Sequence, residues 1–361
     1  MIGLTITRYF AMRFMKTILA IFFTIFCLMF VVIFVEMLRR SSDNPAAGAG
    51  TVALMTAMKV PSAAEMILPF AVLFGSMATF VDLTRKLELI VARAAGMSVW
   101  QFIAAPALTA LLIGIVSVTI YNPLSAEMKQ RSEQMELEIF GRPGSIRIDH
   151  GVWLRQHGVD GLAVIHALET ANAGVDLTGV SVNIYSADGG FVERVEAAKA
   201  HLEPGVWVLK DATVSAPGEP ARQVTSYMLA TDLTPDQAAA ATTPPEGTPF
   251  WRLPAITART AEAGLDATGY RLQFQTLLAR PLLLVAMVLV AASFSLRFFR
   301  FGGVAKTLSG GVVAGFVLYI VTKVLSDLGG AGMISPLVAA WSPALVGSML
   351  GTLTLLYSED G

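Results

Sequence analysis

The sequence predicts an α-helical membrane protein with six transmembrane helices, three before and three after an inserted all-β domain outside the cytoplasm. Of its 361 residues, 54% are hydrophobic and only 15% are charged, whereas about a quarter of the residues in soluble domains are charged. Nearly uncharged runs of bilayer length lie in both the N-terminal and the C-terminal parts of the chain. The middle of the chain instead alternates apolar and polar residues, which is typical of strands.

The first span is the clearest. Residues 17–35, TILAIFFTIFCLMFVVIFV, carry no charge and, at about 1.5 Å per residue, match a hydrocarbon core of roughly 30 Å. The run is longer than the apolar part of a signal peptide, and Glu36 and two arginines follow it in place of a cleavage site, so we expect an uncleaved span. Further spans are expected at about residues 66–81, 99–121, 281–296, 308–322 and 336–356.

Basic residues in the short loops predict the orientation, because lysine and arginine resist translocation. With the N-terminus inside, the cytoplasmic segments hold Arg8, Arg13, Lys16, Arg85, Lys86, Arg93, Arg297, Arg300 and Lys306. The outer short loops hold Arg39, Arg40 and Lys59. We therefore expect both termini to be cytoplasmic.

The β domain is expected over residues 125–265, between a membrane part of residues 1–124 and a second of residues 266–361. Short segments rich in β-branched and aromatic residues, separated by Gly, Asp, Asn or Pro, are typical of strands. They begin at Val152, Leu162, Val180, Val206 and Gln223. Their spacing predicts an antiparallel sandwich or jelly roll, and the Pro- and Ala-rich residues 234–251 are expected to form a linker back to the membrane.

A charged amphipathic helix is expected on the cytoplasmic side at about residues 82–95, ended by Gly96. Its apolar residues recur at spacings of three and four and so share one face. They are Leu83, Leu87, Ile90, Val91 and Ala94. Such a helix could lie in the lipid interface, or it could dock in a groove of a cytoplasmic partner, with its charges fixing the register.

Two charged groups near the outer ends of spans are candidate lipid-binding residues. Glu36 precedes Arg39 and Arg40 by three and four residues, which allows ion pairs on one helix. Adjacent arginines on the translocated side run against the usual charge bias and suit phosphate, so a phosphorylated lipid is a candidate ligand; snorkelling at the interface is the alternative. Lys323 and Asp327, near the outer end of the fifth span, must be paired or face a polar cavity.

The sequence carries no signature of catalysis or of a cofactor. No Walker A, HExxH or GxSxG motif is present, the four histidines lack metal-ligand spacing, and the one cysteine, Cys27, excludes an intrachain disulfide. A net charge of -1 gives no basic field for nucleic acid. We expect no enzyme, metal or cofactor, and a membrane scaffold or sensor stands as the alternative to a transporter.

Three segments carry a family resemblance. They are FVEMLRR at residues 34–40, LMTAMKVPSAAEMILPFAVLFGSMATF at residues 54–80 and ELIVARAAGMS at residues 88–98. Together with the three-plus-three arrangement of spans, they resemble the LptF/LptG permeases of the lipopolysaccharide export transporter, and LptG more than LptF. The resemblance covers essentially the whole chain and is strongest over residues 30–100 and 270–325.

The resemblance implies a permease subunit of an ABC transporter in the bacterial inner membrane. Such a subunit extracts lipopolysaccharide from the outer leaflet and passes it to a periplasmic bridge of β-jellyroll domains. It pairs with LptF, two copies of the ATPase LptB dock beneath, and the single span of LptC inserts at a lateral gate. LptB, and not this chain, hydrolyses ATP.

The resemblance also implies roles for particular residues. The helix after the second span is the coupling helix, which places Arg85, Glu88, Arg93 and Gly96 in or beside the LptB groove. Glu36, Arg39 and Arg40 map to the gate segment that meets the phosphorylated head group. Some LptG proteins carry a lysine where this chain has Ile33, so Ile33 is not included in the site.

Overall fold

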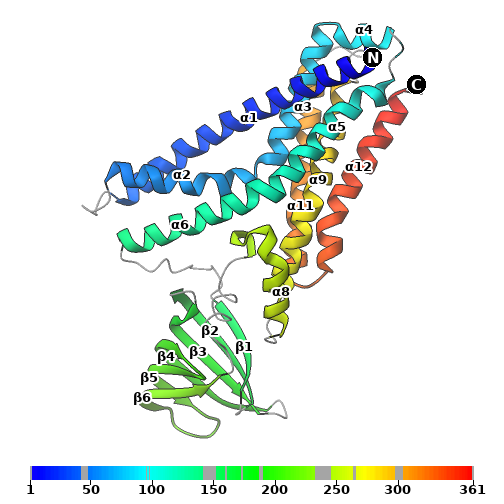
Figure 1. Ribbon diagram of the computed structural model, residues 1–361. Helices are drawn as coiled ribbons and strands as arrows, with labels where there is room; N and C mark the ends of the chain where they lie inside the picture. Colours follow the sequence, from blue (N-terminus) through cyan, green and yellow to red (C-terminus); the bar gives the residue numbers. More distant parts are fainter. Residues whose placement is uncertain are drawn as a thin grey trace.

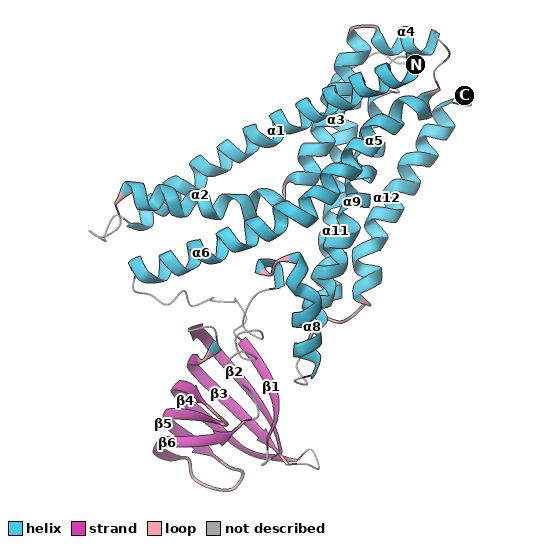
Figure 2. Cartoon of the chain, in the orientation of Figure 1, coloured by secondary structure: helices cyan, strands magenta, loops and turns pink. Residues whose placement is uncertain are grey.

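The computed structural model describes residues 2–41, 48–94, 96, 98–140, 152–158, 161–171, 174–186, 190–231, 245–262, 266–296 and 304–359. The helices are α1 (Ile2–Ser41), α2 (Ala49–Glu65), α3 (Leu68–Arg85), α4 (Glu88–Ala94), α5 (Val99–Val116), α6 (Asn122–Phe140), α8 (Leu253–Glu262), α9 (Thr268–Ser295), α11 (Val304–Gly330) and α12 (Pro336–Glu359). A π-helical turn, η1 (Ser117–Tyr121), joins α5 to α6, and two 3-10 turns, η3 (Pro245–Gly247) and η4 (Phe250–Arg252), precede α8. Figure 2 shows a helical body with a separate sheet.

The described residues contain six candidate spans. Five helical stretches are long and apolar enough to cross a membrane, and α2 with α3 forms the sixth, bent by 67°. Pro69 lies in the first turn of α3, where the missing N–H of proline needs no partner, so the sequence favours the start of a new helix at the bend. The prediction of three spans on each side of an inserted β domain is confirmed.

The two ends of the molecule carry different elements. Figure 1 shows both termini and α4 at the same end of the helical body, while the sheet lies at the other end. This arrangement matches the prediction that the termini and the loop after the second span share one side of the membrane. Two of the basic residues used for that prediction, Arg297 and Arg300, lie outside the described residues.

Close helix packing holds the two halves of the chain together. Gly114 of α5 crosses α9 so closely that a Cβ there would lie 2.5 Å from Pro281 Cα, so this crossing requires glycine. At the N-terminal end of α1, Phe10 packs edge-on against Phe102 and Phe14 against Phe80, each with ring centroids 4.8 Å apart. These aromatic contacts fix that end of α1 against α3 and α5.

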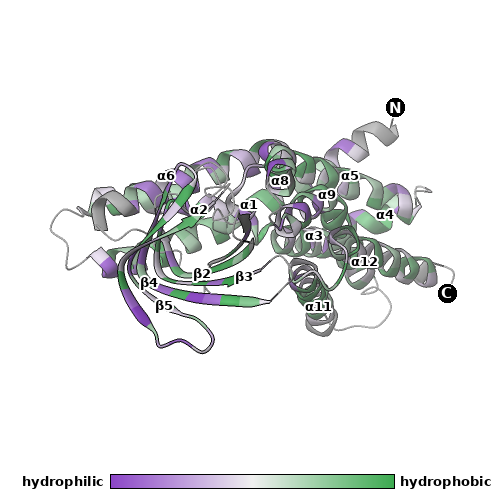
Figure 3. Cartoon of the chain, turned by 90° about the horizontal axis from the view of Figure 1, so that it is seen from below, coloured by the Kyte–Doolittle hydropathy of each residue, from purple (hydrophilic) through white to green (hydrophobic). Residues whose placement is uncertain are grey.

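The β domain is one antiparallel sheet of six strands in sequence order. The strands are β1 (Val152–Gly158), β2 (Gly161–Ala171), β3 (Asp176–Tyr185), β4 (Phe191–Glu203), β5 (Val206–Ser215) and β6 (Arg222–Ala230). One buried row of side chains crosses five of them, namely Leu154, Ile165, Val182, Val195 and Val214. Figure 3 shows the sheet strongly curved, which lets this apolar face cover itself.

The inserted antiparallel β domain is confirmed, but its topology differs from the expected sandwich or jelly roll. Each described strand pairs with the next one along the chain, so the described strands form a meander without crossovers. The strand β4 was not among the expected strands. The strands lie within residues 152–230, α6 and α8 flank them, and most of the expected linker at residues 234–251 lies outside the described residues.

Candidate functional site

The loop after the second span contains two helices in place of the expected single helix at residues 82–95. Helix α3 ends at Arg85, Leu87 takes the left-handed conformation with φ of 61°, and α4 starts at Glu88. The expected common apolar face is therefore wrong: Leu83 is buried in the α3 packing, whereas Leu87 is exposed. Gly96 has φ of 84° and its amide donates to the Arg93 carbonyl at 2.9 Å, as expected for a residue that ends a helix.

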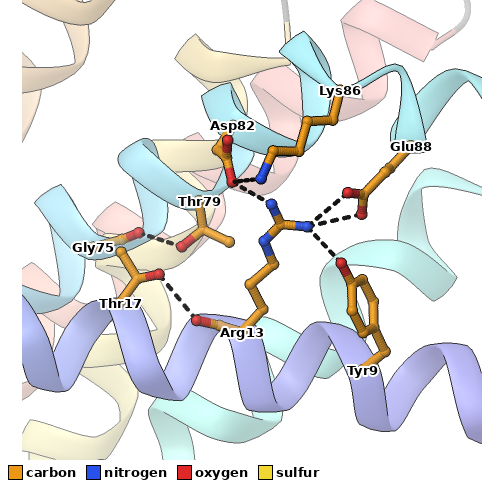
Figure 4. Close-up of polar contacts among 8 residues, drawn as sticks. All are labelled: Tyr9, Arg13, Thr17, Gly75, Thr79, Asp82, Lys86 and Glu88. Atoms are coloured by element: carbon orange, nitrogen blue, oxygen red, sulfur yellow. Dashed lines mark hydrogen bonds and ion pairs between the residues drawn. The ribbon is translucent and has the colours of Figure 1, made fainter.

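Arg13 of α1 joins the two helices across this break (Figure 4). Its Nη1 donates to both carboxylate oxygens of Glu88 at 2.8 and 2.9 Å, and its Nη2 pairs with Asp82 at the end of α3. Nη1 also donates to the Tyr9 hydroxyl at 2.7 Å, and Lys86 pairs with Asp82 at 3.3 Å. Two cations and two carboxylates thus form a neutral, partly buried cluster.

The outward face of α4 carries apolar and basic side chains together. Leu89 and Ala92 are buried and hold α4 against the bundle, whereas Ile90 and Val91 are exposed, Val91 by 66%. The predicted coupling residue Arg93 is exposed on the same helix, and Arg85, at the end of α3, is exposed too. Glu88, also predicted as a coupling residue, instead points inward to Arg13.

The predicted gate residues at the outer end of α1 form the expected local ion pairs. Arg40 Nε lies 2.9 Å and Arg39 Nε 3.4 Å from the carboxylate of Glu36. The side chain of Arg39 is 79% exposed and that of Arg40 is 61% exposed. The three side chains therefore form one exposed group of two cations around one carboxylate.

Lys323 and Asp327 also pair along one helix. Lys323 Nζ lies 3.0 Å from Asp327 Oδ1 on α11, and both side chains are more than half exposed. Among the described residues, the ion pairs of Lys323 and of Glu36 are made within their own helices. The structure does not join the two groups through a direct ion pair.

A second charged cluster, inside the bundle, was not predicted. Glu65 at the end of α2 pairs with Arg280 of α9 and accepts from Asn122 Nδ2 at 2.9 Å and from Ser125 Oγ at 3.0 Å. Both charged side chains are nearly buried, at 9% and 14% exposed. Asn122 Oδ1 also accepts from the Phe250 amide at 2.9 Å, which ties the chain returning from the sheet to this cluster.

A sequence signal for this second cluster did exist. Glu65 and Arg280 directly precede the apolar runs that begin at Met66 and Pro281, where ionisable residues mark the ends of spans. The described residues hold no group of three or more His, Cys, Asp or Glu side chains close enough to bind a metal.

Comparisons with known proteins agree with this architecture. Residues 8–357 match the family described as lipopolysaccharide export system permease LptF/LptG. The lipopolysaccharide export system permease protein LptG of Escherichia coli (strain K12) is 23% identical over 345 residues, which cover 93% of this chain and 94% of that protein. The protein of the same name from Haemophilus influenzae is 22% identical over 352 residues, 95% of each chain. The chain belongs to the LptF/LptG family of lipopolysaccharide export permeases.

Proposed function

We propose that the chain is the LptG-like permease subunit of an ABC transporter that lifts lipopolysaccharide out of the outer leaflet of the bacterial inner membrane. Family membership over almost the whole chain and the LptG-named relatives support this proposal. The transporter would contain an LptF subunit, a dimer of the ATPase LptB, and LptC. The β domain would then be periplasmic, and it would pass the lipid onward through a bridge made with its partners.

The exposed face of α4 is the observation that supports an ATPase partner most directly. Ile90 and Val91 expose apolar surface on α4, Arg93 is exposed on the same helix, and Arg85 is exposed at the end of α3; α4 lies at the end of the molecule that carries both termini. An apolar stripe with flanking charges is suited to a groove, because burial gives affinity and the charges fix the register. The seven-residue α4 therefore fits the docking role that the family resemblance implies.

The outer end of α1 supplies the head-group contact in this proposal. Arg39 and Arg40 both pair with the carboxylate of Glu36, their side chains are largely exposed, and guanidinium groups suit a phosphate of the lipid. Lys323 and Asp327 on α11 would line the same lipid path. Moving acyl chains out of hydrocarbon costs about 0.8 kcal/mol per methylene, so the work must come from ATP hydrolysis by the partner.

Co-purification tests the docking face. The chain is co-expressed with LptF- and LptB-type subunits from the same organism, and bound ATPase and lipid are quantified by mass spectrometry. Val91→Asp should abolish recovery of the ATPase, because it places a charge in the docking face. The matched control is Val192→Asp, at an exposed valine of β4, which should retain the ATPase.

Two outcomes would contradict the proposal. Equal ATPase recovery from both variants would remove α4 as the docking element. A wild-type chain that purifies with envelope proteins but with neither an ATPase nor lipopolysaccharide would favour a membrane scaffold or sensor.

A further inference from the structure

The cluster around Arg13 connects a very short helix to a very long one. Helix α4 has seven residues, too few to be stable alone, because an isolated helix shorter than about 12 residues is marginal in water. Helix α1 is continuous over 40 residues. The orientation of α4 must therefore come from its contacts with the rest of the chain.

Those contacts are of two kinds. Leu89 and Ala92 provide the buried apolar contact of α4, which resists separation but does not by itself fix orientation. Arg13 provides the directional contact, because its planar guanidinium forks between Glu88 on one side of the helix break and Asp82 on the other. Figure 4 shows the guanidinium lying between the two carboxylates.

The other end of this contact is rigid. Phe14, next to Arg13 in the sequence, is fully buried and packs against Phe80 of α3. Arg13 itself is held by the Tyr9 hydroxyl one turn earlier in α1. From Arg13 to Glu36, the helix extends about 35 Å without a break. A displacement at Arg13 therefore reaches the charged group at the outer end of α1.

We propose that Arg13 is a positioning residue that fixes α4 to α1, so that a movement imposed on α4 by the ATPase moves the first span. This inference rests on the proposed function, because it takes the ATPase as the source of movement. Arg13 touches neither the ATPase nor the lipid in this account. It acts only through the carboxylates of Asp82 and Glu88.

The first experiment measures position. The full chain carries Cys27→Ser, to remove its one cysteine, and spin labels at Met12→Cys on α1 and Ala94→Cys on α4, two exposed positions. In nanodiscs, Arg13→Gln should broaden the distance distribution between the labels, whereas Arg13→Lys should broaden it less because one charge pair survives. The matched control is Lys16→Gln, which changes an exposed cation of the same helix end.

The second experiment measures transmission in the assembled, unlabelled transporter. Arg13→Gln should retain bound ATPase while the ATP hydrolysed per lipopolysaccharide exported rises about fivefold or more, with Arg13→Lys intermediate and Lys16→Gln at the wild-type value. If Arg13→Gln matches Lys16→Gln in either measurement, the positioning role is wrong. If no variant, including wild type, binds an ATPase, the proposed function fails, and the label distances still decide whether Arg13 holds α4.

Discussion

The buried Glu65–Arg280 pair allows a quantitative prediction. Arg280→Met removes the cation but keeps most of its apolar stem, and it leaves the Glu65 carboxylate inside the bundle with only two described donors, Asn122 and Ser125. Breaking a buried ion pair by removing one partner costs about 3–5 kcal/mol, because the remaining charge has lost its compensation. Arg280→Met should therefore lower the free energy of unfolding by about that amount.

A double variant tests whether the loss of stability comes from the unpaired Glu65 carboxylate. Replacing a whole buried pair with uncharged residues is often close to neutral, so Glu65→Gln combined with Arg280→Met should be more stable than Arg280→Met alone. The matched control is Lys59→Met, which breaks the 3.2 Å ion pair between Lys59 and Glu136. That pair is about one-third exposed at Lys59 and should contribute less than about 1 kcal/mol.

Tryptophan fluorescence during unfolding in mixed detergent and SDS micelles measures the free energy of unfolding of the wild type and the three variants. The reasoning predicts a large loss for Arg280→Met, a partial recovery in the double variant and a small loss for Lys59→Met. Equal losses for Arg280→Met and Lys59→Met would refute it. So would a double variant that is no more stable than Arg280→Met alone.

Three further predictions follow from other parts of the structure. Arg39→Ala combined with Arg40→Ala should leave the unfolding midpoint unchanged, because both side chains are exposed, but should reduce the lipopolysaccharide recovered by mass spectrometry from the purified complex. Gly114→Val should abolish the monodisperse peak in size-exclusion chromatography, because a side chain there overlaps the backbone of α9, whereas Gly50→Val, with no atom within 4 Å, should preserve it. Trp207→Ala should destabilise the sheet by about 3–5 kcal/mol, because this side chain is only 1% exposed. Thermal melting measures the loss of stability. A smaller loss than that caused by Trp251→Ala, at an exposed tryptophan, would contradict this prediction.

The spans and most of the strands could be predicted because their signal is local. A run of apolar residues has the length of a bilayer, and an alternating segment has the period of a strand, whatever the rest of the chain does. The strand β4 lacks that local signal, since FVERVEAAKAHLE is rich in Glu and Ala, which favour helices. Its strand conformation comes from pairing with β3 and β5 along its whole length.

The break in the loop after the second span could not be predicted from periodicity. The spacing of apolar residues continues through Leu87, yet Leu87 takes a positive φ, which is uncommon for residues other than glycine. The Leu87 amide donates to the Thr84 carbonyl at 3.0 Å and closes the end of α3. Arg13 then holds the two sides of the break from a different helix.

Ion pairs between residues close in the sequence could be predicted, whereas ion pairs between distant residues could not. The pairs of Glu36 with Arg40 and of Lys323 with Asp327 join residues four apart, so helix geometry alone predicts them. The pairs Arg13–Glu88 and Glu65–Arg280 join residues 75 and 215 positions apart. A single sequence marks such residues as ionisable neighbours of apolar runs, but the partner of each is decided by tertiary packing.

Lipid extraction in a purified system tests the central claim most directly. The chain, assembled with LptF- and LptB-type subunits in nanodiscs that contain lipopolysaccharide and phospholipid, is mixed with an excess of soluble acceptor β domain, and the lipid on the acceptor is quantified. The account predicts that lipopolysaccharide, and not phospholipid, moves to the acceptor only when ATP is hydrolysed. Transfer that is independent of ATP, or that does not distinguish the two lipids, would contradict it.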